Sequence, residues 1–254
     1  MGEKHEVTVE RNWQAAGIRT VKVDGVNGSL SVQAGPGDRV ELVARVKSRG
    51  VSPSKDKPNF GFFESIVEGD TLRIAQKRSR VTVSIPFFRS DELQIDYDLM
   101  VPPSAAIDLK TVNGRIAARG ISGEATMTTV NGTIDAEIGG EHEVSAKSVN
   151  GRIRAKFVTG FAGARLKTVN GGVEAILPQS ASFTCNLSQV NGDFEATFPL
   201  SIHSNPGGRR VSGEVNGGRY QLQITTVNGD VEVQHIPPPP PPPAPPALPP
   251  APTS

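Results

Sequence analysis

The chain has 254 residues and a formal net charge of +1, with 27 Lys and Arg against 26 Asp and Glu. The length permits a sizeable core in one or two domains, and the charge balance indicates no acidic partner. The 27 glycines, 21 prolines and 5% aromatic residues, together with few helix-period apolar patterns, favour an all-β protein. The single cysteine, Cys185, excludes an internal disulfide framework. It alternates with Phe183 and Leu187, which predicts a buried thiol.

Residues 1–105 are expected to form a β-layer with longer connections than the rest of the chain. Alternating apolar residues predict the strands, which fall at 7–9, 21–23, 40–46, 72–74, 81–85 and 93–101. Within this region Val26-Asn27-Gly28 is an early copy of a phrase that returns later. Asp96 and Asp98 alternate along the last strand, and this spacing predicts a solvated face rather than a calcium loop.

From residue 106 onward a short phrase, Thr/Ser-Val-Asn-Gly or a close variant, recurs at intervals of 18, 19, 20 and 21 residues. Its asparagines are Asn113, Asn131, Asn150, Asn170 and Asn191. Self-similarity at such a period indicates a repeat architecture. Each repeat has the pattern of two short strands joined by two turns. The apolar residue and the alanine that follow each Asn-Gly are expected to face the core, as in Ile134 with Ala136 and Ile153 with Ala155.

Two architectures fit these repeats. Asn-Gly between alternating strands is a strong hairpin signal, which favours an antiparallel meander. In a solenoid, equivalent positions stack about 4.8 Å apart, so the five asparagines above would form a hydrogen-bonded, buried ladder at one corner. Asparagine recurs at only one of the two turns in each repeat, which favours the solenoid because a meander gives no reason for that restriction. We therefore predict an all-β, solenoid-like stack of two-strand repeats over residues 106–235, closed by a C-terminal cap near Asn228.

The order of these motifs resembles the bacterial "putative adhesin" family of β-strand-repeat domains. The resemblance rests on the repeated Val-Asn-Gly-x-Ile-x-Ala, on Gly69-Asp70-Thr71-Leu72-Arg73-Ile74 and on Tyr97-Asp98-Leu99-Met100-Val101-Pro102, and it spans roughly residues 18–234. It implies a β-solenoid-like stack in an exported or envelope-associated protein and carries over no catalytic or ligand residue. The start, Met1-Gly2-Glu3-Lys4-His5, lacks the apolar segment of a signal peptide, so the protein is cytoplasmic or a leader was removed.

Motifs for catalysis are absent from the sequence, and we expect no enzyme activity, cofactor or metal. The four histidines stand apart without ligand spacing. One alternative is a polysaccharide-active β-helix enzyme, since Glu174 and Glu195 are expected to stack on adjacent coils. No apolar run is long enough to cross a membrane.

A second alternative is a binder of anionic polymer, such as an acidic glycan, through a basic face. Its candidate residues are Lys147, Arg152, Arg154, Lys156 and Lys167. The scarcity of aromatic residues among them argues against nucleic acid. The leading hypothesis is a non-enzymatic structural or adhesive module with an envelope or cell-surface partner.

Residues 236–254 form a proline-rich tail with seven consecutive prolines from Pro237 to Pro243. Because proline fixes φ and lacks an N–H, this composition predicts an extended polyproline II spacer. Deletion of residues 237–254 is therefore expected to leave the midpoint of thermal unfolding unchanged. A truncated chain that unfolds several degrees earlier would show that the tail packs on the domain.

Overall fold

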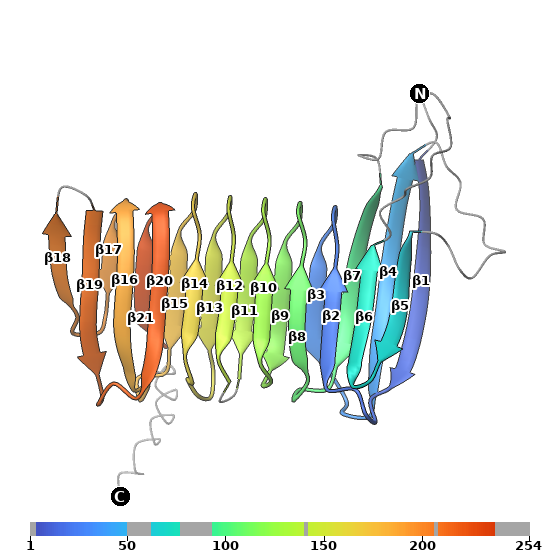
Figure 1. Ribbon diagram of the computed structural model, residues 1–254, viewed down its shortest axis with the longest axis horizontal. Coiled ribbons are helices and arrows are strands. Elements are labelled where there is room, and N and C mark those ends of the chain that lie inside the picture. The colour runs from blue at the N-terminus through green and yellow to red at the C-terminus, as the bar shows by residue number, and fades with distance from the viewer. Residues whose placement is uncertain (1–3, 50–61, 77–92, 140–141, 206–207, 237–254) are drawn as a thin grey trace, which may run out of the picture.

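Two β-sheets face each other along a rod of stacked coils (Figure 1). The computed structural model describes residues 4–49, 62–76, 93–139, 142–205 and 208–236; the strand predicted at 81–85 and tail residues 237–254 lie outside these ranges. Within the described residues the regular elements are all strands. The all-β, solenoid-like prediction is confirmed, and the meander is excluded because neighbouring coils pair in parallel.

Sheet A has ten strands in the spatial order β1-β4-β7-β3-β9-β11-β13-β15-β21-β17. Their bounds are β1 Lys4–Gln14, β4 Arg39–Arg49, β7 Gln94–Val101, β3 Leu30–Ala34, β9 Ile116–Ile121, β11 Ile134–Ile138, β13 Ile153–Phe157, β15 Val173–Leu177, β21 Val231–His235 and β17 Phe194–Ala196.

Sheet B has eleven strands in the order β18-β19-β16-β20-β14-β12-β10-β8-β2-β6-β5. Their bounds are β18 Ser201–Asn205, β19 Gly208–Val215, β16 Phe183–Asn191, β20 Tyr220–Asn228, β14 Ala164–Lys167, β12 Val144–Lys147, β10 Ala125–Thr128, β8 Ala106–Lys110, β2 Thr20–Asp24, β6 Thr71–Gln76 and β5 Phe63–Glu68.

Each coil contributes one strand to each sheet, and the Asn-Gly phrase forms the corner between them. Equivalent residues pair in register from coil to coil, for example Ile134 with Ile153 and Ile153 with Val173. The predicted inward columns are buried, with Ile153 and Ala155 both 0% exposed. In the last coil Phe194 and Ala196 are only half-buried, because the three-residue strand β17 lies at the edge of sheet A.

The order of the coils at the C-terminal end differs from the order along the chain. Strand β20 pairs in parallel with β14 on one side and with β16 on the other, and β21 likewise lies between β15 and β17. The final Val-Asn-Gly phrase therefore lies inside the stack and does not cap it. The antiparallel strands β18 and β19 cover that end of sheet B. At the opposite end β1, β4 and β7 pair antiparallel.

Substitution of a core residue and of its neighbour tests which side chains face inward. Ile153→Ala should lower the free energy of unfolding by about 2–5 kcal/mol, because it opens a cavity between the sheets. Arg152→Ala, on an exposed side chain next to it, should change that free energy by less than about 0.5 kcal/mol. Urea unfolding of both variants gives the comparison. Equal losses would mean that the assignment of the two faces is wrong.

Candidate functional site

Asparagine side chains run along one corner of the stack as a continuous hydrogen-bonded row. Six of its seven asparagines donate from Nδ2 to the Asn Oδ1 of the neighbouring coil at 2.8–2.9 Å. In spatial order the row is Asn27, Asn113, Asn131, Asn150, Asn170, Asn228 and Asn191. The structure thus brings together all five asparagines that the sequence points to and adds Asn27 and Asn228. The expected burial is wrong, since Asn113, Asn131, Asn150, Asn170 and Asn191 are exposed.

A second row of polar side chains, which the sequence analysis did not single out, lies buried just inside the asparagines. The hydroxyl of Thr129 donates to the carbonyl oxygen of Gly114 in the preceding coil at 3.1 Å, and Ser148 and Thr168 repeat this bond. Thr168 is 0% exposed. The signal was the first position of the repeated phrase, where Thr or Ser recurs before Val-Asn-Gly.

The glycine of the phrase is needed because the coils approach closely at this corner. A Cβ atom on Gly132 would lie 1.9 Å from the carbonyl oxygen of Gly114, and one on Gly151 would lie 2.0 Å from that of Gly132. Since this distance is far below contact, any side chain would force the coils apart. Glycine is therefore required at these positions because it alone permits the close backbone contact between coils.

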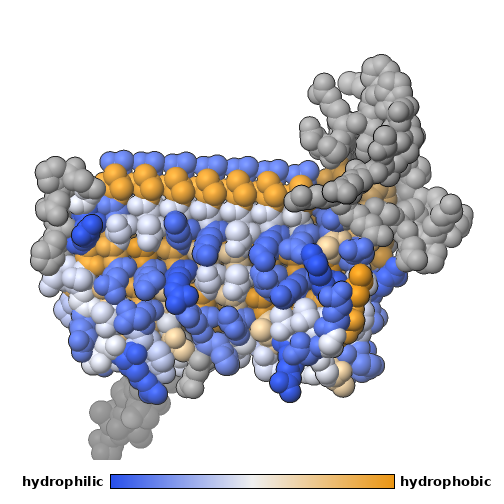
Figure 2. Space-filling model, in the orientation of Figure 1, coloured by the Kyte–Doolittle hydropathy of each residue, from blue (hydrophilic) through white to orange (hydrophobic). Residues whose placement is uncertain are grey.

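The valine of each phrase points outward beside the asparagine row. Val112 and Val130 are each 37% exposed, Val149 is 40% and Val190 is 50%. Figure 2 shows this apolar row as a continuous line below a hydrophilic row along one edge of the molecule. We call the two rows the corner ridge; it consists of the seven asparagines above and of Val26, Val112, Val130, Val149, Val169, Val227 and Val190.

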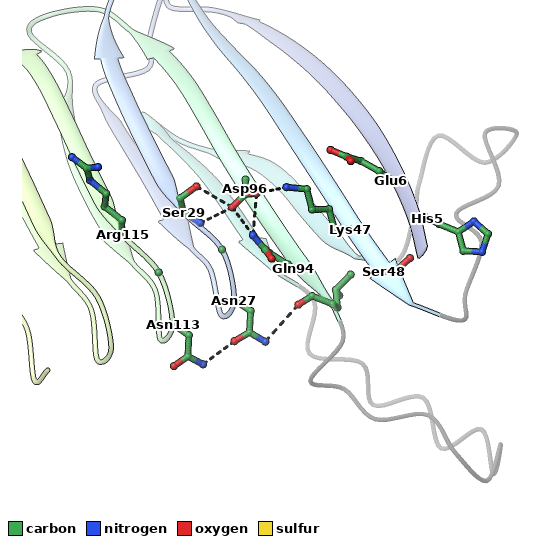
Figure 3. A pocket seen from close by; sticks show the side chains of 13 residues that line it. His5, Glu6, Asn27, Ser29, Lys47, Ser48, Gln94, Asp96, Asn113 and Arg115 are labelled. Atoms are coloured by element: carbon green, nitrogen blue, oxygen red, sulfur yellow. Dashed lines mark hydrogen bonds and ion pairs between the residues drawn. The ribbon is translucent and has the colours of Figure 1, made fainter. Parts of the chain in front are cut away.

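A hollow of about 1060 Å³ lies at the N-terminal end of the corner ridge (Figure 3). Strands β1, β4 and β7 form one wall, and the first two corners of the stack form the other. Its lining carries carboxylate, ammonium, amide and hydroxyl groups and includes His5, Glu6, Asn27, Lys47, Asp96 and Arg115.

Asp96 is the best-fixed charge in this hollow. Its carboxylate accepts hydrogen bonds from the Ser29 N–H and hydroxyl at 2.9 Å each, from Gln94 and from Lys47 (Figure 3). Partial burial alone would raise the pKa of Asp96, but these hydrogen bonds outweigh it and hold the pKa below its usual range. Asp96 is therefore an ionised group that ties β7 to the corner before β3. The predicted solvated face is wrong for this residue, whose side chain is 14% exposed.

The five basic residues do not form one face. Lys147 and Lys167 lie side by side on sheet B, whereas Arg152, Arg154 and Lys156 belong to the next segment, on sheet A. The corner at residues 148–151 carries the chain from one sheet to the other and so separates the two groups. On sheet A, Arg154 pairs with Glu174 at 3.3 Å and Lys156 with Glu137 at 3.7 Å.

The two carboxylates of the enzyme alternative are not on adjacent coils. Glu232 lies in register between Glu174 and Glu195 because β21 is inserted between β15 and β17. Glu174 is also held by the ion pair with Arg154. The three carboxylates form a line of acidic side chains on sheet A, and Glu232 separates the two that the sequence pairs.

The sequence raises the question of three further kinds of functional feature: a reactive thiol, a metal site and a membrane-spanning helix. Cys185 is buried, and burial raises the pKa of its thiol to about 12, so the thiol stays protonated. Among the described residues no three His, Cys, Asp or Glu side chains are grouped so that they could hold a metal ion. The same part of the chain contains no helix long and apolar enough to cross a membrane.

Two substitutions separate the inner and outer polar rows. Thr168→Val should lower the free energy of unfolding by about 1–3 kcal/mol, because it leaves the partly buried carbonyl oxygen of Gly151 without the donor of the fully buried Thr168 hydroxyl. Asn150→Ala removes two exposed hydrogen bonds and should cost about 0.5–1.5 kcal/mol. Thermal unfolding of both variants gives the order. A larger loss for Asn150→Ala would show that the outer row is the stronger constraint on the corner.

The family model described as Toastrack DUF4097 matches residues 102–234, just over half of the chain. One similar solved structure is a "putative cell adhesion protein" from Clostridium sporogenes, at 10% identity, with 91% of this chain and 100% of that chain covered and a TM-score of 0.49. Another is a "putative adhesin" from Bacteroides fragilis, at 10% identity, 91% and 97% coverage and a TM-score of 0.34. No curated protein sequence matches the chain. The chain belongs to the Toastrack DUF4097 family.

Proposed function

We propose that this chain is a non-enzymatic binding module of the bacterial envelope or of an exported protein, and that the corner ridge is its contact surface. The observation that carries the proposal is the row of valines beside hydrogen-bonded asparagines, in which five valines are exposed and Val26 and Val169 are half-buried. Exposed apolar side chains gathered in one line are typical of an interaction surface, whereas scattered ones are not.

The chemistry of the ridge suits an extended partner. Each asparagine within the row uses one amide N–H and one oxygen lone pair for its neighbours, which leaves a second N–H and a second lone pair for a ligand. Seven coils at roughly 4.8 Å present this pattern over about 29 Å. A linear glycan has repeating hydroxyl groups and apolar C–H faces, so it can meet amides and valines at several coils at once. Weak contacts then add along the ridge.

The hollow beside Asp96 extends this surface at one end. Its wall rises next to Asn27 and Asn113, the first two asparagines of the row (Figure 3). A chain end that lies along the ridge would therefore meet the polar groups of the hollow.

A second candidate function is binding of an anionic polymer through sheet B. Lys147 and Lys167 are adjacent in register, and within the described residues neither forms an ion pair. Two unneutralised cations side by side favour a polyanion, whose binding would weaken steeply with salt.

Cosedimentation of the full chain with purified bacterial cell-wall sacculi tests the proposal. The double variant Val130→Ser and Val149→Ser should bind about tenfold more weakly, a loss of roughly 1.4 kcal/mol. The matched control, Lys147→Gln with Lys167→Gln, should bind as the unchanged chain does. The two valines and the two lysines are all exposed, so neither double variant should disturb the core. Unfolding midpoints close to that of the unchanged chain would verify that both variants fold.

The outcomes separate the two candidates. Full binding by the valine variant, or no sedimentation of the unchanged chain, contradicts the ridge as a glycan-contacting surface. Loss of binding in the lysine variant, with capture of dextran sulfate that disappears as salt is raised, supports the second candidate instead.

A further inference from the structure

The chain contains eight Asn-Gly dipeptides, which are prone to spontaneous deamidation. Their asparagines are Asn27, Asn113, Asn131, Asn150, Asn170, Asn191, Asn216 and Asn228. In this reaction the glycine backbone nitrogen loses its proton and attacks the asparagine Cγ, and ammonia leaves as a succinimide ring closes. Water then opens the ring to aspartate or isoaspartate. The reaction requires a glycine N–H that is free to react and a backbone that can rotate.

In six of the eight pairs the stack holds both reacting groups. The glycine N–H donates to the asparagine carbonyl oxygen of a neighbouring coil at 2.8–3.0 Å, and the asparagine side chain is held in the amide row. The six glycines are Gly28, Gly114, Gly132, Gly151, Gly171 and Gly229. Because each coil is packed between two others, attack requires local opening of the stack.

Asn216-Gly217 lies outside the stack, in the turn between β19 and β20. Asn216 has a φ of 50°, and no atom lies within 4 Å of the position that a Cβ on Gly217 would occupy. Within the described part of the chain, the Gly217 N–H has no hydrogen-bond partner. The Gly217 N–H and the space for backbone rotation are therefore available here, and the restraint that remains is on the Asn216 side chain, which forms two hydrogen bonds to backbone carbonyl oxygens.

Asn191-Gly192, at the end of the amide row, is intermediate. The Gly192 N–H likewise has no partner among the described residues, but a Cβ on Gly192 would lie 2.4 Å from the Gly229 carbonyl oxygen. The Asn191 side chain is also tied to Asn228 at 2.8 Å. Packing against the neighbouring coil thus restricts the rotation that ring closure requires.

We infer that Asn216 is the site of spontaneous deamidation in the folded chain, and that the coils protect the six stacked pairs. Conversion to aspartate changes the contacts of the β19–β20 turn, at the end of sheet B that β18 and β19 cover. Asn216 Nδ2 donates to the carbonyl oxygens of Gln179 at 3.1 Å and Ala181 at 3.0 Å, which ties the β19–β20 turn to the segment before β16. Aspartate has no such donor and places a carboxylate against two carbonyl oxygens. Deamidation therefore loosens the antiparallel strands that cover this end of sheet B.

Peptide mapping by mass spectrometry, after prolonged incubation of the full chain in mildly alkaline buffer, tests the site. Asn216 should convert to aspartate and isoaspartate at least about tenfold faster than any of the six stacked asparagines. In denaturant all eight pairs should convert at similar rates, which is the internal control. Conversion of a stacked pair before Asn216, or equal rates in folded and unfolded chains, would overturn the inference.

The variant Asn216→Asp tests, without incubation, whether loss of the Asn216 amide loosens the antiparallel strands β18 and β19. Hydrogen exchange should accelerate about tenfold or more at the backbone of β19 and leave β10 to β13 unchanged. Asn186→Asp is the matched control, because Asn186 lies on β16, is exposed and donates only to the Gln221 side chain at 3.1 Å. Equal exchange in the two variants would contradict the clamping role of Asn216.

Discussion

The close backbone approach of successive coils at the Asn-Gly corner is the constraint on which the rest of the fold depends. The gap admits no Cβ, so glycine is required, and it sets every equivalent atom one strand spacing from its copy. The buried hydroxyl row, the exposed amide row and the valine row all follow from that single translation. Short strands suffice because each one is paired on both sides.

The same translation organises the outer faces. Charges of opposite sign meet across neighbouring coils, as in Arg115 with Asp135 at 2.7 Å and Arg165 with Glu143 at 3.1 Å. Such exposed pairs add little stability. They do keep the sheet faces solvated, and five of the nine large apolar side chains that are exposed among the described residues lie at the corner.

The repeat spacing was enough to predict the sheets, the corner and the inward columns, because residues that are equivalent in sequence are equivalent in space. It failed where neighbours in space come from distant segments. The 12-residue interval before Asn228 reads as an end of the stack, yet β20 lies between β14 and β16. Asp96 accepts a hydrogen bond from Ser29, which is 67 residues away in the sequence, and no local pattern predicts that contact. Parity along one strand also cannot show that Lys147 and Arg152 face opposite ways, since the corner between them changes the sheet.

The inserted last coil has a consequence for how the chain folds as it is synthesised. The coils from β8 and β9 to β14 and β15 can add in the order in which they emerge, each pairing with the one before it. Strand β16 is made before β20, but its parallel neighbour in the stack is β20. Until residues 220–235 are available, β14 offers β16 the same pattern of backbone groups in a non-native pairing. The stack therefore cannot grow strictly in chain order at this end. Strand β16 can take its native place only after residues 220–235 have been synthesised.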